Sequence, residues 1–447
     1  MKTFLPLLVI ALAAVFASAQ QPDAQLLAYI NSIQAVDNHA HVFAPDVPDD
    51  KGYDALRCDV MPQTMTLAPG NLRFGPSTQS TWKALFGVVP STGDEADHKR
   101  LDMEAKLRKE HGDNYYDWVL KQSGIDVVLA NRVAMTPGLK PPNFRWVPYV
   151  DALLFPLNNE ALKKANPDRQ ALFQSEEELL RVYVQQAQLA SIPATLDEYV
   201  GKLLRPILQN QKQAGAVAIK FEAAYLRRLN FAPSEHDVAA DIYRKSLNGP
   251  APSAANYTIV QDYLFHEIAA EAGKIGLAVH IHTGAGCGES FDDAGSDPMQ
   301  LINVLNDPTL RGTNFVMLHG GTPFNRHITT LIVKPNAYVD TSVIELEYSP
   351  QEVARILRPW LEMMPEHILF GTDADFFSPG MAWIETTWLG SHNARLALAI
   401  ALSEMVKDNV ISMPRAKEIA ASVLRENAWK LYHLDVPGGR AEGVVTK

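Results

Sequence analysis

The chain has 447 residues, of which 47% are hydrophobic and 20% are charged. This composition is that of an ordinary globular protein and excludes a chain that is disordered, coiled-coil or collagen-like throughout. The formal net charge is −11 and the sequence contains no long basic run. We therefore expect neither nucleic acid nor an anionic membrane surface as a partner.

The first 19 residues have the pattern of a secretory signal peptide. Lys2 supplies a positive charge, an apolar run covers residues 4–16, and a small-x-small cleavage pattern ends at Ala19. The run is short for a membrane-spanning helix, so an N-terminal membrane anchor is the weaker alternative. We expect cleavage after Ala19, a mature protein of residues 20–447, and a periplasmic or secreted location without membrane attachment.

Eight short apolar runs alternate along the chain with helical patterns such as those of residues 257–275 and 351–364. Alternating strands and helices predict a parallel α/β sheet, and eight such units predict a closed (β/α)8 barrel of the TIM type. No Gly-x-Gly-x-x-Gly motif follows the first run, which disfavours a dinucleotide-binding sheet. The eight runs are Ile33–His41, Ile125–Asn131, Trp146–Leu153, Ala216–Phe221, Leu277–His282, Phe315–His319, Ala337–Asp340 and Ile368–Thr372.

Two of the spacings between runs are too long for simple connections. Residues 45–120 separate the first two runs, and residues 155–213 separate the third from the fourth. We interpret both as helical insertions on the barrel. An insertion after a strand emerges at the catalytic face of such a barrel, so these segments could form a lid. Residues 395–434 predict a tail of helices packed outside the barrel.

Polar residues stand where five of the runs end, which is where barrel enzymes place their chemistry. The first run ends with Asp37, His39 and His41, and alternate residues of a strand share one face. Imidazole and carboxylate groups at such ends suit Zn²⁺, with Fe²⁺ or Mn²⁺ as alternatives. The other run ends carry Lys220 and Glu222, His280 and His282, His319, and Asp373.

Five segments then resemble a known family: IKFEAAYLRRL, VHIHTGAG, LHGGTPFNRHI, LFGTDADFF and ENAWKLYHL. They resemble the amidohydrolase superfamily of metal-dependent barrel hydrolases, and within it the amidohydrolase-2 type related to glutamine-synthetase-like proteins of fungi and plants. The resemblance covers roughly residues 35–434 and is poor over residues 45–120. It implies hydrolysis of a C–N bond, with a small amide as substrate and one or two divalent ions as cofactor.

The resemblance also implies roles for individual residues. Asp373 would move the proton, and His319 or His280 would stabilise the developing oxyanion, although His280 lies one layer deeper and is otherwise a core or supporting histidine. In two-metal members the strand-four lysine carries a bridging carbamate. Lys220 is therefore either a carboxylated ligand or the partner of Glu222 or of an anionic substrate. The implied metal ligands are His39, His41, Lys220, His282, His319 and Asp373.

Substrate recognition is predicted for Tyr225, Arg227 and Glu222, which follow the fourth run. An arginine there could hold a substrate carboxylate through two parallel hydrogen bonds, and a solvated charge is the alternative. The partner is a small molecule, and homo-oligomer formation is left open. Two other functions stay open as well: metal-dependent decarboxylation of an unsaturated acid on the same barrel, and a non-catalytic binding protein.

The sequence contains two cysteines, Cys58 and Cys287. This number excludes a disulfide-rich scaffold, but an exported protein could form one bridge between them. Such a bridge would tie the first insertion over the metal site. Two buried thiols, or Cys287 as an additional soft metal ligand, are the alternatives.

Overall fold

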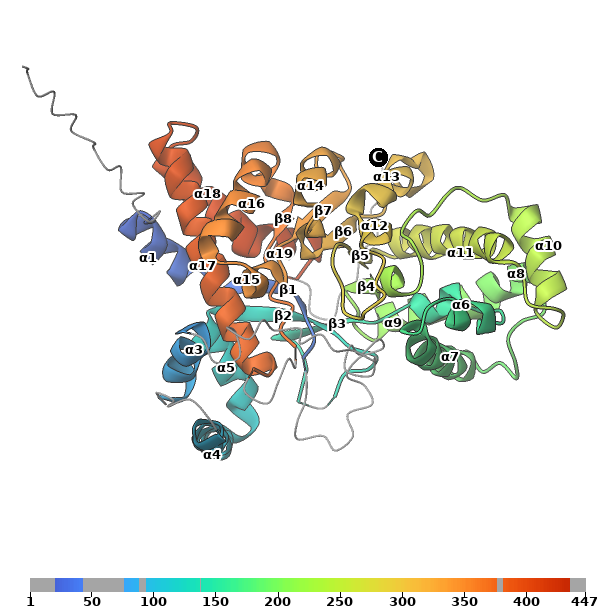
Figure 1. Ribbon diagram of the computed structural model, residues 1–447, viewed down its shortest axis with the longest axis horizontal. Coiled ribbons are helices and arrows are strands. Elements are labelled where there is room, and N and C mark those ends of the chain that lie inside the picture. The colour runs from blue at the N-terminus through green and yellow to red at the C-terminus, as the bar shows by residue number, and fades with distance from the viewer. Residues whose placement is uncertain (1–20, 43–75, 88–93, 137, 376–380, 435–447) are drawn as a thin grey trace, which may run out of the picture.

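The computed structural model describes residues 21–42, 76–87, 94–136, 138–375 and 381–434. In this part of the chain, parallel strands alternate with helices (Figure 1). The predicted signal peptide and Cys58 lie outside the described residues. Among the described helices, none is both long and apolar enough to cross a membrane.

The described strands pair in parallel and form two sheets, ordered β1-β2-β3 and β4-β5-β6-β7-β8. Seven of the eight predicted runs contain one of these strands and the third run overlaps one, which confirms the predicted parallel α/β class. The strands are β1 (Ala35–Ala40), β2 (Ile125–Asn131), β3 (Phe144–Val147), β4 (Ala218–Phe221), β5 (Ala278–His282), β6 (Phe315–Leu318), β7 (Ala337–Asp340) and β8 (Ile368–Leu369).

Backbone contacts link the two sheets at both seams. One seam lies between β3 and β4, and the other lies between β1 and the segment that follows β8. The N–H of His41, for example, donates to the carbonyl oxygen of Ala374 at 2.8 Å. The carboxyl ends of β1 and β8 therefore lie side by side. The isolated parallel bridges at the seams are Trp146–Ala216, Tyr149–Lys220 and Ala40–Ala374.

The third strand differs from the predicted run Trp146–Leu153. The strand covers Phe144–Val147, so it begins before Trp146 and does not continue to Leu153, and a 3-10 helix covers Asp151–Leu154. The physical reason is Pro148, which has no N–H to donate to a strand ladder. The apolar residues beyond Pro148 are buried in the 3-10 helix, so hydrophobicity alone did not distinguish the two conformations.

Helix α16 (Pro350–Met363), between β7 and β8, shows how local sequence determines where a helix begins and which face it buries. Ser349 caps its N-terminus by accepting a hydrogen bond from the N–H of Glu352, and a proline occupies the first turn. Val353, Leu357 and Trp360 recur every three to four residues and are buried. This spacing is that of one helix face, and α16 packs mainly against α17 (Trp383–Lys407).

Helices surround the strands, and both predicted insertions contain helices, α3 to α5 in or next to the first and α6 to α9 in the second (Figure 1). In Figure 1, α3 and α4 lie at the opposite end of the molecule from α6, α7 and α10. The helices are α1 (Ala24–Ser32), α3 (Pro76–Phe86), α4 (Asp94–His111), α5 (Tyr115–Ser123), α6 (Glu160–Ala165), α7 (Arg169–Gln186), α8 (Leu196–Glu198), α9 (Arg205–Gln213), α10 (His236–Ser246), α11 (Ala254–Lys274), α12 (Asp293–Ser296), α13 (Ile302–Asn306), α14 (Asn325–Leu331), α15 (Ile344–Glu347), α16 (Pro350–Met363), α17 (Trp383–Lys407), α18 (Met413–Ala421) and α19 (Asn427–Leu431).

A buried ion pair fastens the first helical region to the helix that follows β8. The guanidinium of Arg100, on α4, lies 2.7 Å from the carboxylate of Glu385, on α17, and both side chains are 1% exposed. Glu385 also accepts a hydrogen bond from the N–H of Ala382, so it caps α17 at the same time. The insertion is therefore held against an element that begins close to Asp373.

Candidate metal centre

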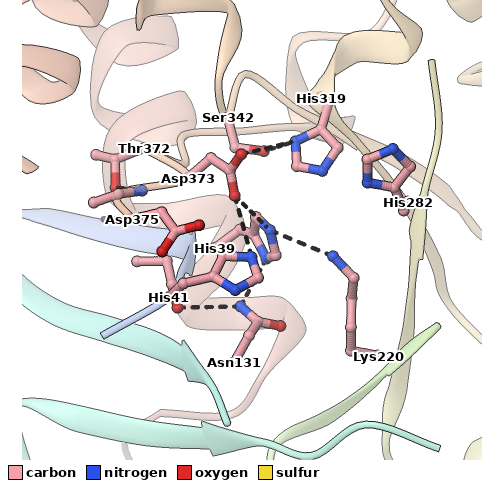
Figure 2. Close-up of polar contacts among 12 residues, drawn as sticks. His39, His41, Asn131, Lys220, His282, His319, Ser342, Thr372, Asp373 and Asp375 are labelled. Atoms are coloured by element: carbon pink, nitrogen blue, oxygen red, sulfur yellow. Dashed lines mark hydrogen bonds and ion pairs between the residues drawn. The ribbon is translucent and has the colours of Figure 1, made fainter. Parts of the chain in front are cut away.

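Imidazoles at the carboxyl end of β1 converge on one carboxylate oxygen in the segment that follows β8. The Nε2 atom of His39 lies 2.9 Å from Oδ1 of Asp373, and the Nε2 atom of His41 lies 3.4 Å from the same oxygen (Figure 2). One potential ligand atom from each of the three residues lies within 4.8 Å of the others. The period of two along β1 brings both imidazoles to the same side, as predicted from the sequence.

Two further predicted ligands line the same space. The Nδ1 atom of His319 lies 3.9 Å from Oδ2 of Asp373, and the imidazole ring of His319 is 5.1 Å from that of His39 between ring centres. The ring of His282 is 4.6 Å from that of His319. His319 and His282 therefore extend the cluster along β5 and β6 but lie outside its tightest group (Figure 2).

Hydrogen bonds orient these two histidines. The Nε2 atom of His282 lies 3.1 Å from the carbonyl oxygen of Ala285, which can only accept, so Nδ1 of His282 keeps its lone pair. The Nδ1 atom of His319 lies 2.9 Å from Oγ of Ser342, and that hydroxyl donates to Asp340 at 2.7 Å. Since the hydroxyl proton is committed to Asp340, His319 donates from Nδ1 and keeps the lone pair on Nε2.

The two histidines at the carboxyl end of β1 are also held by neighbouring side chains. The side-chain amide of Asn131 lies 2.7 Å from Nδ1 of His39, and the hydroxyl of Tyr149 lies 3.2 Å from Nδ1 of His41. The Oδ1 atom of Asn131 is buried without a hydrogen-bond partner. The Nδ2 atom of Asn131 also donates to the carbonyl oxygens of Ala40 and Leu129, at 3.5 and 3.4 Å, which fixes the amide beside His39. The Nε2 atom of His39 thereby stays turned toward Asp373.

The electrostatics of the cluster suit a bound cation. Burial, reinforced by the charge of Lys220, lowers the pKa of both His39 and His282 to about 3, so both imidazoles are neutral at physiological pH. Burial alone would raise the pKa of Asp373, but the neighbouring imidazoles, His319 foremost, hold it well below its usual value. Neutral imidazole and ionised carboxylate are the protonation states that metal binding requires.

The best evidence that the residues fit a metal ion is an unsatisfied atom. Oδ1 of Asp373 is buried and has no hydrogen bond of acceptable geometry, although two imidazole nitrogens lie close to it. A buried, ionised oxygen without a partner is costly, and a cation shared with the two nitrogens would satisfy it. The donor set of imidazoles and one carboxylate is that of Zn²⁺ and related divalent ions.

Lys220 reaches the cluster from β4. Its Nζ atom lies 3.4 Å from Nε2 of His39 and 3.7 Å from Oε1 of Glu222, and the side chain is fully buried (Figure 2). Both predicted roles of Lys220, the carbamate ligand and the partner of Glu222, agree with this placement. Glu222 is 3% exposed and lies beside Lys220, so its predicted contact with a substrate gains no support from its position.

Two predicted site residues lie elsewhere. His280 is fully buried one layer below His282, and its Nε2 atom lies 2.7 Å from the hydroxyl of Tyr432. The prediction that His280 stabilises an oxyanion is therefore replaced by its alternative as a supporting histidine. The guanidinium of Arg227 pairs with Asp262 of α11 at 2.7 Å. Arg227 is thus engaged by α11 and does not face the cluster.

Tyr225, in contrast, lies at the cluster. The 3-10 helix Ala223–Tyr225 follows β4 directly and turns the Tyr225 ring toward His282, at 4.7 Å between ring centres. Phe291 packs on the other side of Tyr225 at 5.1 Å. These rings form an aromatic wall beside the candidate metal centre, which agrees with the predicted role of Tyr225 in substrate binding.

The backbone at the site departs from ordinary conformations. His319 and Asp373 have φ angles of 66° and 52°, in the left-handed region that residues other than glycine adopt rarely. The side chain of Asp37 accepts hydrogen bonds from the hydroxyl and the backbone N–H of Thr372, at 2.6 and 2.9 Å. Asp37 thereby fixes the turn that carries Asp373, and such restrained geometry is common at functional sites.

Asn131, Tyr149, Asp340 and Ser342 were not assigned to the site from the sequence. Asn131 and Asp340 are the last residues of β2 and β7, so the rule that found the other strand-end residues could have found them. Tyr149 and Ser342 lie beyond their strands, and no sequence signal marks them.

Cys287 is buried and disulfide-bonded. A sulfur atom in a disulfide is not available as a thiolate ligand, so the alternative in which Cys287 binds the metal is wrong. The predicted partner, Cys58, lies outside the described residues.

Known proteins share the fold of the chain. Aligned with the uronate isomerase of Thermotoga maritima, it has a TM-score of 0.62 and 14% identity over 91% of this chain and 96% of that one. With a proposed metal-dependent hydrolase of Lactobacillus casei, the TM-score is 0.59 with 16% identity over 92% and 98%. These identities are low, so the similarity establishes a shared fold and not a shared reaction.

Sequence comparisons identify the family. Over 169 residues, 37% of this chain, the sequence is 29% identical to protein fluG of Emericella nidulans, and the match spans 18% of the length of that relative. Residues 213–434, which carry β4 to β8 with Lys220, His282, His319 and Asp373, match the amidohydrolase family model Amidohydro_2. The chain therefore belongs to the amidohydrolase family.

Proposed function

We propose that the protein is an exported, metal-dependent hydrolase that cleaves a C–N bond of a small amide on a closed (β/α)8 barrel. The observation that carries this proposal is the group formed by His39, His41 and the unsatisfied carboxylate of Asp373. The bridges at both seams support closure of the barrel. Export rests on the sequence of the first 19 residues.

His39, His41 and Asp373 would hold a divalent ion, with His282 and His319 as further ligands. Zn²⁺ fits this donor set best, and Mn²⁺ or Fe²⁺ fit it as well. When bound, such an ion polarises a carbonyl group and lowers the pKa of water from about 15.7 to about 7.

The chain's own groups supply the rest of the chemistry. Asp373 is ionised, so its carboxylate can take a proton from the attacking water and pass it to the leaving nitrogen. The imidazoles of His39, His282 and His319 are neutral and their orientation is fixed by hydrogen bonds, which keeps the ligand atoms in place without reorganisation. Tyr225, beside His282, gives the substrate an aromatic surface to contact.

A panel of small amides, with and without prior chelation, tests this function. We expect metal-dependent release of amine from at least one of them, and loss of that release in Asp373→Asn but not in the control Asp241→Asn, since Asp241 is a half-exposed residue of α10 that pairs with Arg244 and Lys245. Metal-dependent release of carbon dioxide from unsaturated acids, with no amide hydrolysed, would favour the decarboxylase instead. Amide hydrolysis that persists after verified metal removal would overturn the proposed mechanism.

A further inference from the structure

Tyr432 lies beneath the candidate metal centre, immediately after α19 and far from the centre in sequence. The tyrosine is 5% exposed. Its hydroxyl lies 2.7 Å from Nε2 of His280 and donates a hydrogen bond to Oδ1 of Asn38. Asn38 is fully buried and is the neighbour of His39 on β1. The C-terminal helical segment thus reaches the metal-binding strand through a side-chain contact.

The contact continues to a second part of the centre. The Nδ2 atom of Asn38 donates to Oδ2 of Asp340 at 2.9 Å. The other oxygen of Asp340 accepts from the N–H of His319 at 2.8 Å and from the hydroxyl of Ser342 at 2.7 Å. Ser342 in turn lies 2.9 Å from Nδ1 of His319 (Figure 2). All these side chains are at least nine-tenths buried.

The direction of every hydrogen bond in this chain follows from Asp340. Its carboxylate accepts from the backbone of His319 and from both side-chain neighbours, so it acts only as an acceptor. The amide of Asn38 must then turn its NH2 group to Asp340 and its oxygen to Tyr432. The hydroxyl of Tyr432 supplies the donor that this orientation of Asn38 needs, and His280 donates to the hydroxyl.

We propose that Tyr432 is a positioning residue of the metal centre: its hydroxyl fixes the amide of Asn38, which through Asp340 and Ser342 holds His319 with Nε2 free. This inference rests on the proposed metal centre. Without the hydroxyl, Oδ1 of Asn38 loses its donor in a buried site, and rotation of the amide would turn an oxygen toward the carboxylate of Asp340.

A second buried tyrosine, Tyr243, provides a matched control for the replacement of Tyr432 by phenylalanine. The hydroxyl of Tyr243 is also buried, but it donates at 2.8 Å to the backbone carbonyl of Pro193. Replacement of Tyr243 by phenylalanine therefore removes the same atom and one hydrogen bond without touching the chain of side chains that leads to His319. A purely structural role of Tyr432 predicts that the two replacements behave alike.

The test measures the dissociation constant for Zn²⁺ by competition with a chromogenic chelator in wild type, Tyr432→Phe and Tyr243→Phe. We expect Tyr432→Phe to weaken binding at least about tenfold, the usual effect of a residue that supports a metal ligand, and Tyr243→Phe to change it less than about twofold. Ser342→Ala should weaken binding as well, and the double variant should lose less than the product of the single effects. Equal affinity in wild type and Tyr432→Phe, or an equal loss in both tyrosine variants, would overturn the proposal.

A second measurement does not depend on how the variants fold. In metal-free wild type with ¹⁵N-labelled histidine, the imidazole of His319 should carry its proton on Nδ1, and a proton on Nε2 would overturn the inference. The two proposals fail separately. If wild type binds no divalent ion the proposed function fails, whereas a wild type that binds Zn²⁺ no better than Tyr432→Phe contradicts only the positioning role.

Discussion

His39 and Asp373 have different tasks in the candidate centre, although they lie 2.9 Å apart. In the proposed function His39 would supply a neutral ligand nitrogen, whereas Asp373 would supply the ionised oxygen that also moves the proton. We expect His39→Ala to lose bound metal. Asp373→Asn keeps an oxygen at the same place and should retain much of the metal. Each change should lower turnover by at least about 10³-fold, within the range for loss of a general base. Metal analysis and steady-state kinetics on the same samples measure both effects.

The control for these variants is His236→Asn, because His236 lies on the surface at the start of α10. This variant should retain both metal and turnover. If His39→Ala or Asp373→Asn kept full activity, the assignment of the centre would be wrong.

The sequence predicted the positions of His39, His41 and Asp373 because a period of two and the ends of parallel strands are local features. The partners of the imidazoles could not be predicted in the same way. Whether Asn131 meets His39, or Ser342 meets His319, depends on the register between strands and on turns beyond them. Arg227 was misplaced for a related reason: a short 3-10 helix after β4 turns its side chain to α11, where Asp262 binds it.

Among the elements, the contact between α4 and α17 has the clearest energetic consequence. Arg100 and Glu385 are both 1% exposed, so removal of one partner leaves a buried charge without its ion pair. Arg100→Met should lower the free energy of unfolding by about 3–5 kcal/mol, and the double variant Arg100→Met, Glu385→Leu should lose less, because no uncompensated charge remains. Urea unfolding of the three proteins measures this. A double variant as unstable as Arg100→Met would show that packing, not the charge, stabilises the contact.

The stability of the first turn of α10 should depend on pH. The imidazole of His236 donates hydrogen bonds to the carboxylates of Asp237 and Asp197, which raises the pKa of His236 above its ordinary value, so the folded state binds a proton that the unfolded state releases. The contribution of His236 to the stability of the folded state is complete below about pH 6.5 and is lost as the pH rises through the raised pKa of His236. Because the side chains are exposed, the protection factors of the α10 amides, which exclude the intrinsic pH dependence of hydrogen exchange, should fall by no more than about fivefold over that range. The same fall in His236→Asn would contradict the assignment.

At the scale of the whole molecule, the parallel α/β class could be predicted because eight apolar runs and the helical patterns between them are visible in the sequence. The bounds of the third strand could not, because Pro148 ended it inside a continuous apolar run. The contacts at the two seams could not be predicted either, because they join residues that are distant in sequence, such as Ala40 and Ala374. Fold alone does not decide the reaction, because the structural neighbours include a uronate isomerase.

Metal removal should affect the whole molecule as well as its activity. An ion that binds the folded chain alone stabilises it by about 2.7 kcal/mol when its concentration is 100 times the dissociation constant. We therefore expect chelation to lower the unfolding temperature and to abolish turnover, and Zn²⁺ or Mn²⁺ to restore both. In His39→Ala, neither chelation nor added Zn²⁺ should shift the unfolding temperature as it does in wild type. A wild-type unfolding temperature that is unchanged by verified metal removal would argue against a metal held by the fold.

The most direct test of the candidate metal centre is the metal content of protein purified without added metal, determined by plasma mass spectrometry for wild type and His39→Ala. The arrangement of His39, His41 and Asp373 predicts at least one divalent ion for each wild-type chain and a large loss in the variant. Wild-type protein that is folded and catalytically active but contains no divalent metal, or equal metal in the two proteins, would contradict it.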